Sequence, residues 1–154
     1  MAIVAGRPTA FLALANRQKS KPVVVRAVTA NPIVADSATR TVAVLGATGF
    51  IATECDTLWV GIEVTSGAGT VTLEPLILDA DGALWMQILM GAMPGITDIA
   101  APAAFKTPAM SPGQLIEVPV LGQTVFFRID AVGGSPVNLQ VLAYPGRPRL
   151  GLRI

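Results

Sequence analysis

The clearest pattern in the chain is the alternation of apolar and polar positions over residues 57–66. The alternating positions are Leu58, Val60, Ile62 and Val64 on one side and Trp59, Gly61, Glu63 and Thr65 on the other. A period of two is that of a strand with one buried face. Glycine-containing turns at 66–69 and 79–82 divide residues 57–90 into three apolar runs. We therefore predict an antiparallel three-stranded meander over residues 57–90.

Further short apolar runs predict strands at 23–28, 42–45, 115–121, 124–130 and 137–144, the third and fourth forming a hairpin around Gly122-Gln123. No segment of ten residues has convincing helical character. The chain therefore predicts an all-β fold, an antiparallel β-sandwich or jelly-roll-like domain with about eight short strands. We place this domain at residues 23–144, between extended basic arms at 1–22 and 145–154. Pro75 and Pro119 fall inside strand patterns, which indicates edge strands or bulges.

The composition is unusually apolar, with 52% hydrophobic and 14% charged residues among 154, whereas about 25% charged is ordinary. The longest charge-free run, 82–97, is shorter than the ~20 apolar residues that span a bilayer, so no membrane partner is expected. Residues 1–18 imitate a secretion signal only weakly, and we expect no secretion. The apolar excess then predicts burial between subunits.

The missing residue types exclude most hydrolase mechanisms. The chain has no histidine and only one cysteine, Cys55. A Ser-His-Asp triad, a Cys-His pair, a histidine-ligated metal and an internal disulfide all need residues that are absent. We therefore expect neither an enzyme nor a cofactor or metal site.

Residues 41–52, TVAVLGATGFIA, resemble the nucleotide-binding opening of extended short-chain dehydrogenase/reductases, with Gly46, Gly49 and then Ala52 at the glycine positions. Such a site needs a helix directly after the turn, whose N-terminal amides hold the pyrophosphate. The strand predicted from residue 57 leaves no room for one, and the family's Tyr-x-x-x-Lys is absent. Nucleotide binding through Gly46 and Gly49 is thus kept as a remote alternative.

Two acidic patterns in the chain have both a chemical and a structural interpretation. Residues 79–82, Asp-Ala-Asp-Gly, resemble the start of a calcium loop, but position 12 is Met90 and no helix flanks it, so we predict a turn. A catalytic carboxylate pair could be drawn from Glu54, Asp56, Glu63 and Glu74. Nothing in the sequence brings them together, and we predict solvated side chains.

Charge is distributed unevenly along the chain. Residues 1–40 hold six basic residues against Asp36, residues 41–143 hold nine acidic residues against two basic ones, and residues 144–154 hold three arginines. Basic arms on an acidic body suit arms that bind a neighbouring copy or another acidic protein surface. The alternative is that the arms are solvated or fold back on their own body. Direct nucleic-acid binding is not expected, since the body is acidic and the arms lack interleaved aromatics.

Methionines cluster at the end of the predicted meander and in the Pro- and Ala-rich connection 91–114, at Met86, Met90, Met93 and Met110. Methionine suits adaptable interfaces as well as irregular cores, so both interpretations stay open. The predicted interaction residues are Arg7, Arg17, Lys19, Lys21, Met90, Met93, Arg147, Arg149 and Arg153.

In general character the chain resembles small β-sandwich virion proteins of tailed bacteriophages, such as capsid decoration (cement) proteins and fibre modules. The shared features are low charge, richness in Ala, Val, Gly and Pro, no histidine, extended termini and tightly joined strands. The resemblance implies a non-enzymatic, homo-oligomeric virion protein, assembled in the host cytoplasm, that binds other copies and a capsid protein and stabilises the shell. The alternative is a head or tail fibre module that binds carbohydrate or a receptor, while small-molecule partners are not expected.

Overall fold

The structure is a computed structural model that describes residues 22–90 and 102–148. Its elements are β1 (Val23–Val28), α2 (Val42–Leu45), β2 (Phe50–Ile51), β3 (Thr57–Ser66), β4 (Gly69–Leu78), β5 (Trp85–Gln87), β6 (Leu89–Met90), β7 (Ala103–Ala104), β8 (Ile116–Pro119), β9 (Thr124–Gly134) and β10 (Val137–Pro145). The predicted all-β sandwich is confirmed, with ten strands in place of about eight. Two of the ten strands, β6 and β7, form a separate pair of two residues each. The predicted arms fall almost entirely outside the described residues.

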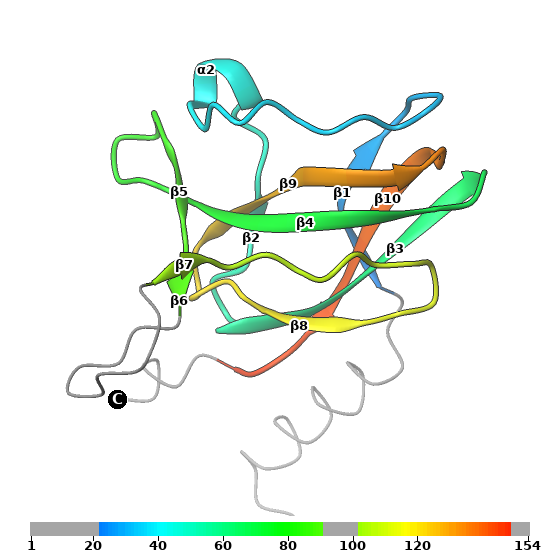
Figure 1. Cartoon of the computed structure of the whole chain (residues 1–154). Helices are drawn as coiled ribbons and strands as arrows, with labels where there is room; N and C mark the ends of the chain where they lie inside the picture. The colour runs from blue at the N-terminus through cyan, green and yellow to red at the C-terminus, as the bar shows by residue number, and fades with distance from the viewer. Residues whose placement is uncertain (1–21, 91–101, 149–154) are drawn as a thin grey trace, which may run out of the picture.

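Two four-stranded antiparallel sheets form the sandwich (Figure 1). Sheet I has the order β1-β10-β3-β8, and sheet II has the order β2-β9-β4-β5. When β6 and β7 are set aside, the first strand pairs with the last, the second with the next to last, and so on inward to β4 and β5. This nested pairing is that of a long hairpin rolled into two sheets, which is the jelly-roll arrangement.

The core lies between the sheets, where every second side chain points inward. On β3 the predicted alternation is confirmed, because Leu58, Val60 and Ile62 are at most 4% exposed. The facing positions of sheet II are equally buried, among them Leu73 and Phe127. These positions form one continuous apolar core, with the largest side chains contributed by β4 and β9.

The predicted meander is wrong in one connection. β4 and β5 form a hairpin, but β3 belongs to sheet I and β4 to sheet II. The turn at 66–69 is a corner between sheets, and it packs against the corner that joins β9 to β10. A Cβ on Gly67 would lie 2.2 Å from the carbonyl oxygen of Ser135, and one on Gly69 would lie 2.3 Å from that of Gly133. Glycine is required here because two corners meet. The predicted hairpin around Gly122-Gln123 is likewise a connection between sheets.

The predicted strand at 42–45 is a four-residue helix, α2. The backbone N–H of Val42 donates to Ala83, and that of Gly46 donates back to Val42 to end the helix. Val42 and Leu45 both pack against the buried side chains of sheet II. Four apolar residues fit a strand or one helical turn equally well, and in this protein the tertiary contacts select the helix.

The two prolines differ in position. Pro119 ends β8, which is an edge strand as predicted. Pro75 lies in β4, which is an inner strand, so its placement at an edge is wrong. The outer side of β4 is nevertheless interrupted there, because β5 faces residues 76–78 and Thr107 bonds at Leu73. A missing N–H is tolerated in that gap.

Candidate functional site

The outer face of sheet II is covered by the protein's own chain. The connection from β1 to β2, with α2, passes above β9 in Figure 1. Under it lie Leu76, Trp85 and Phe126, whose exposed fractions are 0%, 1% and 7%. The indole N–H of Trp85 donates to the carbonyl oxygen of Gly46 at 2.9 Å, which fixes the cover to the sheet. This second apolar cluster explains why one tryptophan is fully buried.

A network of charged side chains lies beside this apolar cluster, on the same outer face of sheet II. Glu74 on β4 is fully buried and lies directly opposite Arg128 on β9. Its carboxylate accepts from Arg128 at 2.9 Å, from Arg40 at 3.0 Å and from the side-chain amide of Gln87 at 2.9 Å. Arg128 also pairs with Asp130, which in turn pairs with Lys106. We call Arg26, Asp36, Arg40, Glu74, Lys106, Arg128 and Asp130 the charge network.

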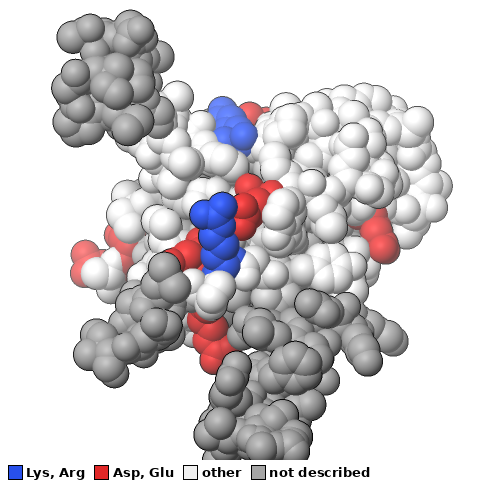
Figure 2. All heavy atoms as spheres, turned by 90° about the horizontal axis from the view of Figure 1, so that it is seen from below, with Lys and Arg blue, Asp and Glu red and all other residues white. Residues whose placement is uncertain are grey.

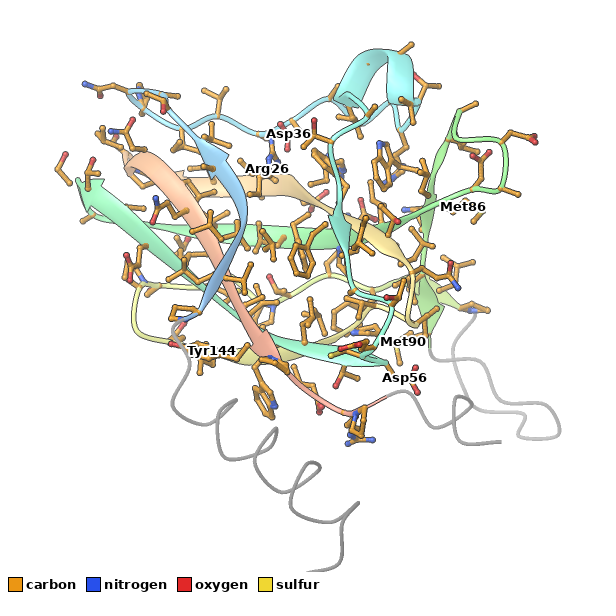
Figure 3. The ribbon with its side chains drawn as sticks, turned by 180° about the vertical axis from the view of Figure 1, so that it is seen from behind. Arg26, Asp36, Asp56, Met86, Met90 and Tyr144 are labelled. Atoms are coloured by element: carbon orange, nitrogen blue, oxygen red, sulfur yellow. The ribbon has the colours of Figure 1, made fainter. Side chains whose placement is uncertain are left out.

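Arg26 and Asp36 complete the network at the edge of β9, and they lie beside each other in Figure 3. The carboxylate of Asp36 accepts from the backbone N–H of Ile129, whose carbonyl accepts from the N–H of Asp36. Arg26 donates to the carbonyl of Phe127 and lies 4.7 Å from the ring centroid of Phe126. The pair therefore bonds to the free backbone groups of β9 beyond the two residues that β2 pairs with.

Two carboxyl groups of this network, the buried Glu74 and the partly buried Asp36, are held ionised. Burial raises the pKa of Asp36, but the hydrogen bonds from Arg26 and Ile129 outweigh it, and the net pKa lies below its ordinary value. Burial likewise raises the pKa of Glu74, and the hydrogen bonds from Gln87, Arg128 and Arg40 outweigh it. A shifted pKa can mark a catalytic group. Among the described residues, however, every buried side-chain nitrogen and oxygen has a partner. The geometry of the network is that of a structural ion-pair cluster with all its donors and acceptors in use.

The outer face of sheet I is uncovered among the described residues. Register places three rows of side chains across it. The first row contains Glu117, Trp59 and Tyr144, the second contains Gly61, Leu142 and Val24, and the third contains Glu63, Gln140 and Ala27. Leu115, just before β8, lies beside Gly61 in the middle row. Trp59 is 41% exposed, Val24 is 46% exposed and Leu115 is 53% exposed. We call these three rows the open face.

Gly61 shapes the middle of the open face. A Cβ at this position would lie 2.9 Å from the Leu115 side chain and 2.9 Å from the carbonyl oxygen of Gln114. The segment before β8 thus folds over the glycine. A shallow hollow of about 250 Å³ lies there, lined partly by Glu63, Leu142 and Tyr144. A second hollow of about 280 Å³ lies on the other side of Glu63, along β1 and β10.

Only two of the predicted interaction residues fall within the described ranges. Met90 is 50% exposed and lies with Met86, Leu84 and Leu89 along the edge formed by β5 and β6 (Figure 3). Arg147 is 75% exposed, but it pairs with Glu117 at 3.4 Å and its backbone bonds to Thr57 and Asp56. This part of the C-terminal arm lies on its own body. Arg7, Arg17, Lys19, Lys21, Met93, Arg149 and Arg153 lie outside the described residues.

Met110 is a core residue and not part of an exposed methionine surface. It is 1% exposed, and its backbone pairs with Val71 of β4. Thr107 is buried beside it and bonds to Leu73. The described part of the long connection therefore serves as an edge for sheet II, because β5 is too short to cover the whole length of β4.

The glycine-rich segment does not have the geometry of a dinucleotide site. Gly46 ends a short helix, and the two-residue strand β2 follows Gly49. The required order is strand, turn and then helix. Gly49 is explained by packing, since a Cβ there would lie 2.7 Å from the Trp85 ring.

The acidic motifs resolve into separate structural roles. The carboxylate of Asp79 accepts from the N–H groups of Ala83 and Leu84, which confirms the predicted turn. Glu74 and Glu63 point outward from opposite sheets, so they cannot form a catalytic pair; Glu74 is also buried, which contradicts the predicted solvation. No group of three or more metal-ligating side chains occurs within residues 22–90 and 102–148.

Comparisons with protein-family models, with curated proteins and with solved structures find no match for this chain. No helix in the described ranges is long and apolar enough to cross a bilayer.

The open face was not predicted as a site, although the sequence carried its signal. The outward positions of β3 begin with Trp59, a large aromatic where a solvated face would carry polar residues. On β10, Leu142 and Tyr144 are likewise large side chains at outward positions. What the sequence alone could not supply was the pairing of β3 with β10, which places these side chains on one surface.

Proposed function

We propose that the protein is a non-enzymatic structural component of a bacteriophage virion that forms oligomers and binds the capsid shell as a decoration protein. The open face carries this proposal. Exposed aromatic and aliphatic side chains on regular strands mark protein interaction surfaces. The face combines Trp59, Leu115 and Val24 with a rigid backbone of four paired strands.

Two further features support an assembly role. The edge of β5 and β6 offers a second exposed apolar surface around Met86, Leu89 and Met90. The buried charged side chains of Glu74 and Arg128 are paired with each other in the charge network, as in a structural ion-pair cluster. A jelly roll suits such a role but also serves other functions, so the fold adds no more than compatibility.

Labelling of intact particles tests the proposal. Antibody raised against the full chain is applied to virions purified from the culture that naturally produces it, and bound gold particles are located by electron microscopy. We expect regular labelling of the capsid exterior. Labelling restricted to tails would favour the fibre alternative, and unlabelled particles would overturn the proposal.

A carbohydrate-binding module is the second candidate, because the open face also has an aromatic platform. Trp59 and Tyr144 are directly paired in register, beside the hollow that contains Glu63. Stacking of a sugar on an aromatic ring with a nearby carboxylate is a familiar binding arrangement. If the protein has this function, the full-length chain should bind glycans on an array, and Trp59→Ala should abolish that binding. Equal glycan binding by the unaltered protein and by Trp59→Ala would exclude this site.

A further inference from the structure

Among the described residues, charge outside the network is almost entirely negative. The described residues include nine acidic and five basic residues, and the charge network contains three of the acids and four of the bases. Outside the network, the described residues therefore hold six acidic residues and one basic residue, Arg147. Figure 2 shows acidic side chains scattered over one face of the body, with basic ones confined to small spots. Such a surface attracts a basic partner.

The first 21 residues have the complementary chemistry. They contain Arg7, Arg17, Lys19 and Lys21 and no acidic residue. They also contain bulky apolar residues, namely Ile3, Val4, Phe11, Leu12 and Leu14. A segment with both features matches a surface that is apolar and acidic together.

The open face has this combination of properties. Glu63 is exposed, lines both hollows and has no ion-pair partner among the described residues. Around it lie the apolar Leu142, Leu115 and Val24. Oppositely charged groups at an apolar contact set register and exclude wrong partners.

The entry of the chain into β1 favours a contact with a different copy. Val23 pairs with Ala143 at the end of an edge strand, and Tyr144 follows Ala143 at that same end of the sheet. A residue before proline favours extended backbone, and Pro22 therefore favours continuation along β1 over reversal onto the same sheet. Twenty-one residues can extend up to about 70 Å, far beyond the roughly 15 Å width of four paired strands.

We propose that the open face binds residues 1–21 of a neighbouring copy, with Glu63 receiving one of the basic side chains and the hollows receiving apolar ones. This inference rests on the proposed function, because it names the surface through which the copies assemble. It predicts a head-to-tail contact, in which each copy donates its N-terminal segment and receives another. Contacts of that kind close into rings or extend into arrays.

Disulfide trapping between two full-length variants tests the contact. In a Cys55→Ser background, one chain carries a single cysteine at position 5, 13 or 20 (Ala5→Cys, Ala13→Cys or Ser20→Cys). The other carries Gln140→Cys, which lies opposite Glu63 in register. The matched control replaces Gln140→Cys with Asp81→Cys, which is also exposed and lies in the turn between β4 and β5. We expect at least one pair with Gln140→Cys to yield covalent heterodimer about tenfold above the control, and Glu63→Lys to reduce that yield.

Light scattering on the same samples separates the two proposals. Oligomers without heterodimer trapping would overturn the assigned surface and leave the assembly proposal standing. Monomers without trapping would overturn both. An intramolecular disulfide in an Ala13→Cys/Gln140→Cys variant would also overturn the proposed contact. So would disulfides that form only between the position-140 cysteines of two Gln140→Cys copies.

Discussion

The outer faces of the two sheets follow the same alternation of side chains but have opposite environments. On sheet II the outward Glu74 and Leu76 are fully buried, because the connection between β1 and β2 covers them. On sheet I the outward Trp59 is 41% exposed and Glu63 is exposed. The covered face requires every charge to be paired, since an isolated buried charge is strongly unfavourable. The open face has no such requirement, and its apolar groups remain available to a partner.

The two tryptophans should show the largest difference between the faces. Trp85→Ala removes a side chain that is 1% exposed, together with its hydrogen bond to Gly46. We expect the free energy of unfolding to fall by about 4 kcal/mol. Trp59→Ala should lower it by less than about 1 kcal/mol, because much of this side chain is already in water. Urea denaturation of both variants measures the two values, and equal losses would contradict the contrast.

The next largest difference in stability should be between substitutions of the two outward glutamates, Glu74 and Glu63. Glu74→Gln leaves the Arg128 and Arg40 guanidinium groups without their shared carboxylate. Loss of one partner of a buried ion pair costs about 3–5 kcal/mol, and we expect the lower end because Asp130 still pairs with Arg128. Glu63→Gln, the matched variant on the open face, should change stability by less than about 0.5 kcal/mol. A similar loss in both would show that the charge network does not distinguish the faces.

Acid should weaken the covered face selectively. Asp36 and Glu74 have folded-state pKa values below the ordinary 3.8 and 4.5, so the unfolded chain binds protons first as the pH falls. Their contribution to stability is present above the ordinary values and is lost as the pH falls through the folded-state values. The urea midpoint should therefore decline steeply below about pH 4.5. Glu74→Gln should flatten the decline; a pH profile identical to that of the unaltered protein would contradict this account.

Fluorescence quenching should give the smallest but simplest difference. Iodide or acrylamide should quench Trp59 and leave Trp85 almost unaffected, so Trp59→Phe should remove most of the quenchable signal. If the open face is covered in the oligomer, quenching should rise upon dilution. A quenchable signal that persists in Trp59→Phe would mean that Trp85, on the covered face, is exposed, which would contradict this account.

The sequence predicted the fold class and the inward and outward sides of β3, because a period of two depends only on local geometry. It did not predict which sheet each strand joins. The turn at Ser66–Gly69 reads as a hairpin, and only the distant pairings of Ser66 with Val137 and Gly69 with Gly134 make it a corner. The burial of Glu74 was missed for the same reason. Its cover, Arg40, is 34 residues away, and a short segment such as 42–45 gives no sign that it will fold over a sheet.

The native mass of the full chain tests the central claim, that the open face joins one copy to another, most directly. Light scattering should be measured on the unaltered protein, on Leu142→Glu, which places a charge in the middle row of the open face, and on Val44→Glu, whose exposed position on α2 belongs to neither apolar surface. The account predicts an oligomer for the unaltered chain, dissociation to a monomer for Leu142→Glu, and no change for Val44→Glu. A monomeric unaltered protein at high concentration, or an oligomer that survives Leu142→Glu, would contradict it.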